Sequence, residues 1–550
     1  MPQTPSPDPG ARAPGAAERA WRAAERALDR LCGAGENPLR QLGALGFLLF
    51  WLIAASGIYL YIFFDTSVEG AHASIERLTH GQWWAGGVMR SVHRYASDAF
   101  VAVVGLHLVR ELMLGRFRGF RWYSWVSGVP TLWLAAASGV IGYWLVWDQL
   151  AQFLSIALTE WFGALPGFGP SLVRNFVTEE AMTDRLFSLL VFAHIGVPLA
   201  LLLAMWAHIQ RLTRAVTMTS RALTGWTFAW LLALSLAFPA LSQAPADLAR
   251  VPASVPIDWF YIAPFALVYE TSSLFVWALV LGATLLLAAA PWLVPGRRPP
   301  AAVVDPANCN GCTRCFADCP YAAIVMAPHP GGRGRIAVVS EDLCAGCGIC
   351  AGACPTATPF RSGERVVTGI DMPSLPSEAL RVELAGKLDR ACAAPVASAR
   401  GRGPAPAQQA SQGAAREPVH PIVVFRCAEA AAVQPQPDLV TLDMTCAGML
   451  PPSFAEYALR RGAGAVVVAS CPIEDCGYRF GARWTVERMR GEREPGLRAS
   501  VDPRRVVVAH ASREEPEELG EAIARARAAL AGGSAASAAS EGATRAPQES

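Results

Sequence analysis

Two pairs of histidines stand in otherwise apolar stretches of the chain. His93 and His107 are fourteen residues apart in "SVHRYASDAFVAVVGLHLVR", and His194 and His208 repeat this spacing. On an α-helix, fourteen residues rise about 21 Å and turn about 40° less than four full turns, so both imidazoles of a helix look the same way. A lone polar residue also serves helix packing, but matching pairs predict two haem b sites, His93 with His194 and His107 with His208.

Four glycines share this fourteen-residue period: Gly43 with Gly57 and Gly128 with Gly142. A residue without a side chain lets a flat macrocycle lie against the backbone, so the glycines predict haem packing. Arg90 and Arg110 each stand three residues outside a histidine. We expect them to balance haem propionates; ordinary arginines at the membrane edge are the alternative.

Eight cysteines form two runs, "CNGCTRCFADCP" and "CAGCGICAGACP". Each run has the C-x2-C-x2-C-x3-C-P spacing of bacterial two-cluster ferredoxins, in which the fourth thiolate crosses to the other cluster. The spacing predicts one [4Fe–4S] cluster on Cys309, Cys312, Cys315 and Cys354, and a second on Cys344, Cys347, Cys350 and Cys319. Zinc and disulfides are the alternatives, and a reducing cytoplasm disfavours disulfides.

Four further cysteines follow predicted strands of an α/β domain. Cys427, Cys446 and Cys471 come directly after or close behind strands, and Cys476 follows five residues after Cys471. Because ligands collect at the carboxyl ends of strands in open α/β sheets, we expect these thiols to converge at one edge. Scattered buried cysteines are the alternative.

The elements that must position these residues divide the chain into a membrane half and an iron–sulfur half. The 550 residues are 53% hydrophobic and 17% charged, too apolar for an ordinary soluble enzyme, and the net charge of +2 gives no nucleic-acid signal. Six segments are long and apolar enough to span a membrane: 43–63, 93–113, 128–147, 187–210, 224–242 and 269–294. Arginine-rich loops on one side predict cytoplasmic termini and a bacterial inner-membrane location.

The expected fold is multi-domain: an all-α transmembrane haem-binding bundle of about six helices, an α+β ferredoxin-like two-cluster domain, and a small α/β iron–sulfur domain. The expected boundaries are 1–35 for a disordered tail and an amphipathic helix, 36–297 for the bundle, 300–365 for the two-cluster domain, 366–418 for a linker, 419–530 for the last domain and 531–550 for a disordered tail. The amphipathic helix places Trp21, Ala24, Leu28 and Leu31 on one face.

The membrane half resembles cytochrome b of the quinol-oxidising bc and b6f complexes. "RSVHRYASD", "HLVRE", "GYWLVWDQL" and "DRLFSLLVFAHIGVPLA" carry the resemblance. "VPIDWFYIAPFAL" resembles the family's Pro-Glu-Trp-Tyr loop, although the four positions here read Ile257, Asp258, Trp259 and Phe260. The resemblance implies an outer quinone site at Asp258 and Trp259, where the carboxylate takes a proton from quinol. The family's last two helices are absent from the sequence.

The end of the chain is similar to the delta subunit of methyl-viologen-reducing hydrogenase. "TCAGMLPPSFAEYALRRGAGAVVVASCPIEDCGYRFGARWTVERM" carries this similarity, over about residues 420–512. That family holds a [2Fe–2S] cluster, which the resemblance places on Cys427, Cys446, Cys471 and Cys476. It also implies a cytoplasmic flavo- or iron–sulfur oxidoreductase as partner.

Together these features predict a membrane electron-transfer protein, a quinone oxidoreductase or a subunit of one. It would link the quinone pool, through two b haems and cytoplasmic iron–sulfur clusters, to a soluble redox partner. The alternative is an anchor and conduit for a cytoplasmic hydrogenase, formate dehydrogenase or heterodisulfide-reductase-like enzyme, without an outer quinol site. A separate Rieske or cytochrome c subunit, bifurcation of quinol electrons, and a homodimer stay open.

Overall fold

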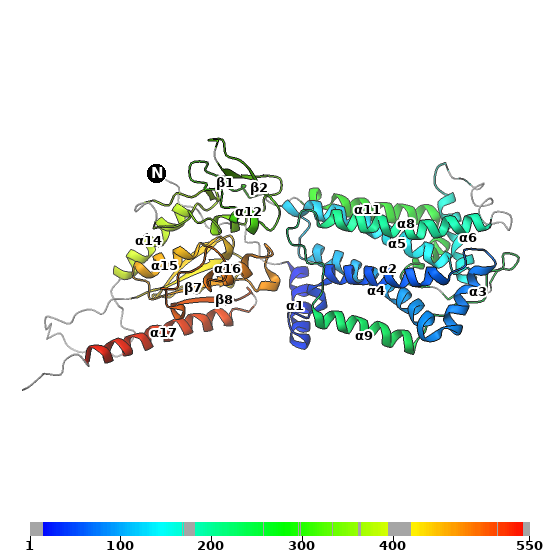
Figure 1. Ribbon diagram of the computed structural model, residues 1–550, viewed down its shortest axis with the longest axis horizontal. Coiled ribbons are helices and arrows are strands. Elements are labelled where there is room, and N and C mark those ends of the chain that lie inside the picture. Colours follow the sequence, from blue (N-terminus) through cyan, green and yellow to red (C-terminus); the bar gives the residue numbers. More distant parts are fainter. Residues whose placement is uncertain are drawn as a thin grey trace, which may run out of the picture. The chain divides into compact units, whose positions relative to one another are not determined.

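The computed structural model describes residues 15–542 except 168, 170–181, 253, 257, 295, 297, 298, 333, 361–364, 394–419 and 514. The chain divides into two compact units. Residues 14–297 form the helical unit, and residues 298–550 form the cysteine-rich unit (Figure 1).

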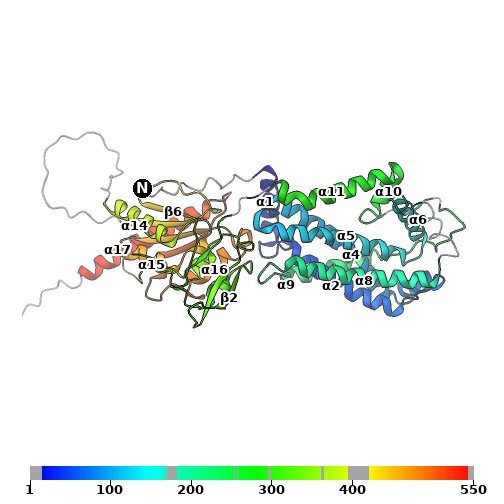
Figure 2. The same cartoon turned by 90° about the horizontal axis from the view of Figure 1, so that it is seen from above.

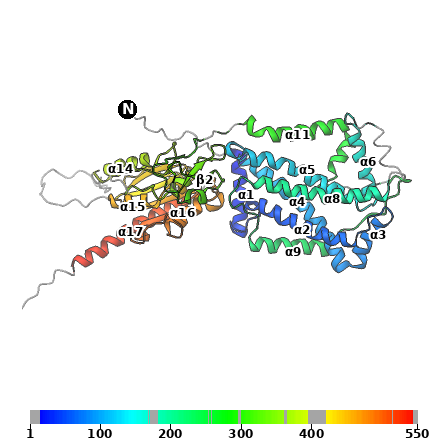
Figure 3. The same ribbon diagram turned by 45° about the horizontal axis from the view of Figure 1, so that its top comes forward.

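The helical unit is built from helices that run side by side, with α1 lying across one of their ends (Figure 1 and Figure 3). α2 packs along α4, and α5 packs along α8. Side-chain oxygens of Thr183, Ser220 and Ser272 cap the N-termini of α8, α9 and α11. The helices are α1 (Ala16–Cys32), η1 (Pro38–Arg40), α2 (Leu42–Phe63), α3 (Gly70–Glu76), η2 (Arg77–Gly81), η3 (Trp83–Gly87), α4 (Val88–Met113), η4 (Gly119–Arg121), α5 (Trp122–Trp144), α6 (Gln149–Gly163), α8 (Asp184–Ile209), α9 (Arg221–Ala237), α10 (Ala263–Glu270) and α11 (Ser273–Leu293).

Four stretches of the described residues are long and apolar enough to cross a membrane: Leu42–Phe63, Gly119–Trp144, Asp184–Ile209 and Ser273–Leu293. α8 turns large apolar side chains outward, among them Phe192, Leu199 and Leu203, as expected of a helix in lipid. Two of the six expected spans fall outside this set. α4 has 26 residues but carries charged side chains in its first and last turns, and α9 has only 17 residues. The number of six spans stays a prediction.

The amphipathic helix expected near the start of the chain is α1. Its buried residues are Trp21 and Glu25, whereas Ala24 is exposed and Leu31 is 82% exposed. The interfacial role of its apolar face stays a prediction. The structure adds a buried carboxylate with cationic partners, described below, on the covered side of α1.

The cysteine-rich unit begins with two small antiparallel sheets around the two cysteine runs. β2 (Ile324–Pro328) pairs with β3 (Arg335–Val339), and β1 (Val303–Val304) pairs with β4 (Ile370–Asp371). Two short helices, α12 (Arg314–Asp318) and α13 (Ile349–Gly352), each lie inside one cysteine run. Because β1 pairs with β4, this fold extends to residue 371, beyond the expected end at 365.

The last part of the chain is a parallel α/β sheet with strand order β6-β5-β7-β8 (Figure 2 shows its helices α14, α15, α16 and α17). All four predicted strands form: β5 (Ile422–Cys427), β6 (Leu439–Met444), β7 (Ala465–Ser470) and β8 (Val506–His510). β7 is buried along its whole length, as a central parallel strand should be. The other elements are η5 (Ala447–Met449), α15 (Pro452–Arg460), η6 (Ile473–Asp475), α16 (Gly481–Met489), η7 (Pro503–Arg505) and α17 (Glu517–Gly542).

The expected linker over residues 366–418 is wrong in its first half. Residues 377–393 form the helix α14 (Ser377–Ala393), which packs on β6. Leu380, Leu384 and Leu388 recur every four residues and are almost fully buried in the core of the sheet domain. That period is the signal of a packed helix. At the other end, α17 continues past residue 530, where a disordered tail was expected.

Candidate cofactor sites

The four histidines of the apolar stretches meet in two pairs between α4 and α8. The ring centroids of His93 and His194 are 6.2 Å apart, and those of His107 and His208 are 6.4 Å apart. A metal about 2.0 Å from one nitrogen of each ring would separate the centroids by about 6.3 Å, because each nitrogen lies about 1.15 Å from its ring centre. The spacing therefore suits an iron held between two axial imidazoles.

Backbone carbonyls orient both rings of the His93 and His194 pair. The Nδ1 atom of His93 lies 3.0 Å from the Ile53 carbonyl oxygen, and the Nδ1 atom of His194 lies 3.0 Å from that of Ser138. A carbonyl only accepts, so each Nδ1 carries the proton and each Nε2 presents a lone pair. Imidazoles that bind metals are oriented in this way, by a hydrogen bond from the ring nitrogen opposite the metal.

The His107 and His208 pair is held less symmetrically. The Nδ1 atom of His208 lies 3.2 Å from the Ser127 hydroxyl oxygen. The Nδ1 atom of His107 is buried and has no hydrogen-bond partner among the described residues. A buried ring nitrogen without a partner is costly whether or not the ring binds a metal, so this imidazole is oriented less firmly than the other three.

Each predicted glycine lies against one of these imidazoles. Gly57 faces His93, Gly142 faces His194, Gly128 faces His208 and Gly43 faces His107. A Cβ added at Gly142 would stand 2.8 Å from Cε1 of His194, whereas one at Gly43 would stand 3.8 Å from Cε1 of His107. The glycines thus keep the space around the four rings free of side chains, and the residues present fit two haem groups.

Arg90 has protein partners in the structure. Its guanidinium donates to the hydroxyls of Thr79 and Ser242, and one nitrogen lies 3.6 Å from a Glu76 carboxylate oxygen. These contacts account for its burial without a haem. Its role as a propionate partner stays a prediction.

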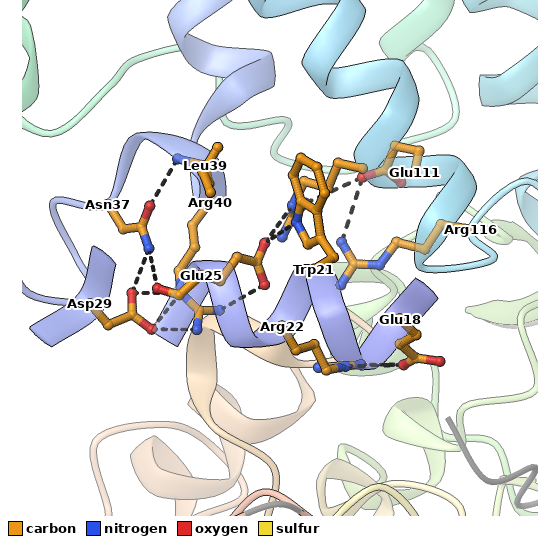
Figure 4. A network of polar contacts seen from close by, with 11 residues as sticks. Glu18, Trp21, Arg22, Glu25, Asp29, Asn37, Leu39, Arg40, Glu111 and Arg116 are labelled. Carbon is orange, nitrogen blue, oxygen red and sulfur yellow. Dashed lines mark hydrogen bonds and ion pairs between the residues drawn. The ribbon is translucent and has the colours of Figure 1, made fainter. Parts of the chain in front are cut away.

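A buried polar network, with Glu25 and Glu111 among its members, joins α1 to α4 (Figure 4). Arg110 links these two carboxylates. Its Nε donates to Glu25 at 2.8 Å, and its Nη1 lies 3.2 Å from Glu111. Glu25 also accepts from the indole N–H of Trp21 at 3.0 Å and lies 3.8 Å from Arg40. The side chain of Glu25 is 1% exposed, so this carboxylate is compensated by buried donors. A propionate role for Arg110 likewise stays a prediction.

Asp258, predicted at the outer quinone site, is engaged by a cation. The Arg94 guanidinium bridges Asp258 and Asp98. Asp258 also accepts from the backbone N–H groups of Phe260 at 2.7 Å and Tyr261 at 2.9 Å. Burial favours the neutral acid, but the Tyr261 N–H and Arg94 outweigh it and lower the pKa of Asp258. The carboxylate is therefore ionised at neutral pH.

The neighbours of Asp258 include residues that sequence reasoning missed. Tyr261 is buried, and its hydroxyl donates to the Ser97 carbonyl at 3.0 Å. Its ring occupies the space that a Cβ at Gly139 would fill. The Arg94 guanidinium lies over the Tyr143 ring, 4.7 Å from its centroid. Charged side chains inside apolar helices are the signal that could have found Arg94.

Trp259, the second predicted residue of this site, points away from it. Its side chain is 80% exposed. Ile257, which stands at the first position of the same motif, lies outside the described residues. The structure thus brings Asp258, but not Trp259, into the buried polar cluster.

The first predicted set of cluster ligands meets around one cavity. Cys309, Cys312, Cys315 and Cys354 all line it, together with Gly311 and Met326. Burial and the charges of the neighbouring thiols raise the pKa of Cys315 to about 12. Bound iron would reverse this shift, since a coordinating thiol loses its proton.

The second set, Cys319, Cys344, Cys347 and Cys350, also lies together, since the charges of three of these thiols act on Cys350. Burial, reinforced by the charges of Cys347, Cys344 and Cys319, raises the pKa of Cys350. Gly346 precedes Cys347 as Gly311 precedes Cys312, and both glycines have φ +67°. The repeated left-handed turn shows that the two cysteine runs share one local fold, which only glycine adopts without strain.

The four last cysteines form a closed ring of thiols at the carboxyl edge of the parallel sheet. Cys427 ends β5, Cys446 follows β6, Cys471 follows β7 and Cys476 follows η6. All four are buried, and the thiols of Cys446 and Cys471 each hydrogen-bond to those of Cys427 and Cys476. These hydrogen bonds lower the pKa of Cys427 and Cys476. The donor set fits an iron–sulfur cluster bound by four cysteines.

Three family models match the chain in the predicted order. Residues 37–216 match Cytochrome b/b6/petB, residues 308–358 match a 4Fe-4S dicluster domain, and residues 423–532 match the delta subunit of methyl-viologen-reducing hydrogenase. The three resemblances seen in the sequence are confirmed. They imply haem b in the first region and [4Fe–4S] clusters in the second.

Similar proteins include several cytochromes b6 and b. Cytochrome b6 of Tupiella akineta is 30% identical over 172 residues, which are 30% of this chain and 78% of that protein. Cytochrome b6 of Heliomicrobium gestii is 29% identical over 168 residues, again 78% of that protein. Cytochrome b of Rhodobacter capsulatus is 31% identical over 141 residues, only 31% of its length. Among solved structures, "Hyperthermophilic respiratory Complex III" is 19% identical, with a TM-score of 0.39, and the match covers 46% of this chain and 74% of that one.

Proposed function

Because the chain belongs to the cytochrome b/b6 family through its N-terminal region, we propose that it links the quinone pool, through two b haems and cytoplasmic iron–sulfur clusters, to a soluble redox partner. The combination of domains fits a membrane electron-transfer subunit. The observation that carries the proposal is the two imidazole pairs, 6.2 and 6.4 Å between centroids, in one polypeptide with three sets of four thiols. Bound haem and iron–sulfur groups would supply one-electron transfer.

The protein residues hold these groups and manage protons. His93, His194, His107 and His208 would hold the haem groups, with backbone carbonyls fixing Nδ1 at the first pair. At the quinone site Asp258 accepts a proton from quinol. Because Arg94 holds Asp258 ionised, the carboxylate is ready to accept, but the ion pair must loosen as the proton arrives.

We propose that the protein lies in a bacterial inner membrane with both termini in the cytoplasm, and that a flavo- or iron–sulfur oxidoreductase docks at the end of the chain. The similarity of residues 423–532 to a hydrogenase delta subunit supports this partner class. Driving one electron inward against the membrane potential costs about 2.3 kcal/mol per 100 mV. Plant-type ferredoxin clusters lie near about −400 mV, so flow from quinol to clusters needs an energy source, whereas flow from clusters to quinone does not.

A second candidate is a conduit that docks a cytoplasmic hydrogenase, formate dehydrogenase or heterodisulfide-reductase-like enzyme without turning over quinone at Asp258. Two observations favour this candidate. Asp258 is paired with Arg94, so its carboxylate is not free to bind quinol, and the exposed Trp259 provides no aromatic ring beside it. Copurification of a Rieske or cytochrome c subunit would favour a third arrangement, in which one quinol divides its electrons.

The experiment compares Asp258→Asn with the wild-type protein after a quinol analogue is added under anaerobic conditions, reading the optical bands of the haems. Asp247→Asn is the matched control, since Asp247 is an exposed acid whose partner, Arg250, is exposed too. The quinone proposal expects haem reduction in the wild type and the control and at least a tenfold slower rate in Asp258→Asn. Equal rates in all three would leave the conduit as the function.

A further inference from the structure

Helix α13 of the two-cluster domain packs directly on the edge of the parallel sheet that carries the last four thiols. Ile349 is fully buried in one apolar cluster with Cys347, Cys446 and Trp484. Cys347 belongs to the second predicted [4Fe–4S] set, and Cys446 belongs to the thiol ring of the sheet. Ile349 therefore lies between a ligand of one set and a ligand of the other.

Glycines remove the side chains that would hold these two segments apart. A Cβ at Gly352 of α13 would stand 2.2 Å from the carbonyl oxygen of Gly448. A Cβ at Gly448 would stand 3.0 Å from Cγ1 of Ile349, and one at Gly481 would stand 2.3 Å from Sγ of Cys446. Backbone thus meets backbone at this contact, which no larger residue permits.

A buried ion pair fastens the same contact. Arg488 on α16 is fully buried; it donates to Asp318 of α12 at 2.5 Å and to the Gly448 carbonyl at 2.8 Å. Arg493 also donates to Asp318, whose side chain is 5% exposed. Asp318 precedes Cys319, and Gly448 follows Cys446 by two residues. The ion pair therefore ties a ligand segment of one thiol set to a ligand segment of the other.

We infer that Arg488, Asp318 and the glycine contact form a fixed junction. It holds the Cys319, Cys344, Cys347 and Cys350 set against the Cys427, Cys446, Cys471 and Cys476 set, for direct transfer of one electron between the groups that they bind. This inference rests on the proposed function and deepens it. It names the [4Fe–4S] set that exchanges with the sheet domain and the side chains that position it. In the transfer, the group on one set is oxidised by one electron and the group on the other is reduced by one, and no bond to a ligand is broken.

The charges of the junction give it a second property. Burial lowers the pKa of Arg488, and the charges of Asp318 and Cys446 oppose that shift. A cation beside the Cys446 set stabilises its reduced, more negative state. The Asp318 carboxylate beside Cys319 has the opposite effect on the other set, reduced by its second cation, Arg493. Arg488 and Asp318 thus bias the electron toward the sheet domain.

The test is electron paramagnetic resonance of the full-length protein, dithionite-reduced, in which no quinone or partner is needed. The wild type should show magnetic interaction between the two reduced groups, seen as split signals or faster spin relaxation. Gly352→Ala, which forces the segments apart, should weaken this interaction at unchanged iron and sulfide content. Gly386→Ala on α14 is the matched control, because an added Cβ there meets only an Arg390 nitrogen at 3.7 Å.

Potentiometric titration distinguishes a specific electrostatic role of Arg488 and Asp318 from a general loss of folding. Arg488→Met should lower the midpoint potential of the group on the Cys446 set, and Asp318→Asn should raise that of the group on the Cys319 set. Arg483→Gln, which removes an exposed ion pair with Glu487 on the same helix, should change neither.

No magnetic interaction in the wild type, with both groups present, would overturn the junction even if every variant failed to fold. Shifts of the same sign in Arg488→Met and Asp318→Asn would overturn the electrostatic bias. Neither result depends on whether quinol reduces the haems, so failure of the junction and failure of the proposed function are distinguishable.

Discussion

The helical unit treats buried charge differently at its two ends. Near His93, the Arg94 guanidinium bridges Asp98 and Asp258 in a loop whose next residue, Trp259, is 80% exposed. Near His107, Glu25 of α1 is 1% exposed and meets Arg110 and Arg40. Near His93 the ion pair lies beside an exposed loop. Near His107 the charged side chains are buried beneath α1. The difference agrees with the proposal that the charges near Asp258 take part in a reaction, whereas those near His107 hold α1 in place.

The largest expected difference between the two ends follows from removing one histidine of the His93 and His194 pair. His194→Ala leaves His93 without its partner, and we expect the haem content to fall from two per chain to one, with the His107 and His208 site intact. Haem extraction and optical spectra would measure this. His80→Ala is the control, because His80 is an exposed residue outside both pairs. Loss of both haems in His194→Ala would show that the two sites are not independent.

Removal of Glu25 tests whether the buried ion pairs near His107 stabilise the folded helical unit. Glu25→Ala leaves the Arg110 charge buried with only Glu111 near it, and breaking a buried pair in this way costs about 3–5 kcal/mol. Thermal unfolding in detergent would measure the loss. Glu18→Ala on the same helix is the control; Glu18 pairs with Arg22 in a partly exposed ion pair, for which we expect under about 1 kcal/mol. Equal effects of the two variants would contradict a structural role of the network.

Glycine substitutions compare the space around the two histidine pairs. Gly142→Ala would bring a Cβ to 2.8 Å from the His194 ring, whereas Gly43→Ala would leave 3.8 Å to the His107 ring. We expect Gly142→Ala to shift the optical band and midpoint potential of its haem clearly, and Gly43→Ala to shift them little. A redox titration followed at the haem bands measures both. A larger effect at Gly43 would mean that contact with the macrocycle, not with the imidazole, decides these positions.

The pH dependence of Asp258 should be small above pH 5. Its pKa in the folded protein is lowered from 3.8, so its charge stabilises the folded state above the pKa of the unfolded chain. That contribution is lost as the pH falls through the lowered folded pKa. The stability difference between the wild type and Asp258→Asn should therefore shrink as the pH falls below about 4. A difference that does not shrink there would contradict an ionised Asp258.

The sequence predicted the ligand sets because spacing carries them. Fourteen-residue periods place His93 with His107 on one helical face, and the C-x2-C-x2-C-x3-C-P runs define their own local fold. Residues that are distant in sequence but paired in the structure show no such spacing pattern. Asp318 and Arg488 are 170 residues apart, and nothing local shows that they meet. The α14 helix was missed although its leucines recur every four residues, because Pro- and Ala-rich sequence follows it and resembles a linker.

The buried carboxylate of α1 was likewise not predicted from the sequence. Trp21, Ala24, Leu28 and Leu31 share one helical face, but the structure also buries Glu25 beside Trp21. A buried carboxylate is predictable only when its cations are known, and Arg110 lies on another helix.

The most direct test of the central claim is a haem count joined to a redox titration of the full-length membrane protein, with low-temperature electron paramagnetic resonance of the ferric state. Two b haems per chain, both low-spin with bis-imidazole signals and separate midpoint potentials, are the result predicted from the His93–His194 and His107–His208 pairs. A preparation with intact iron–sulfur signals but no haem, or with one haem lost only when both pairs are removed, would contradict it.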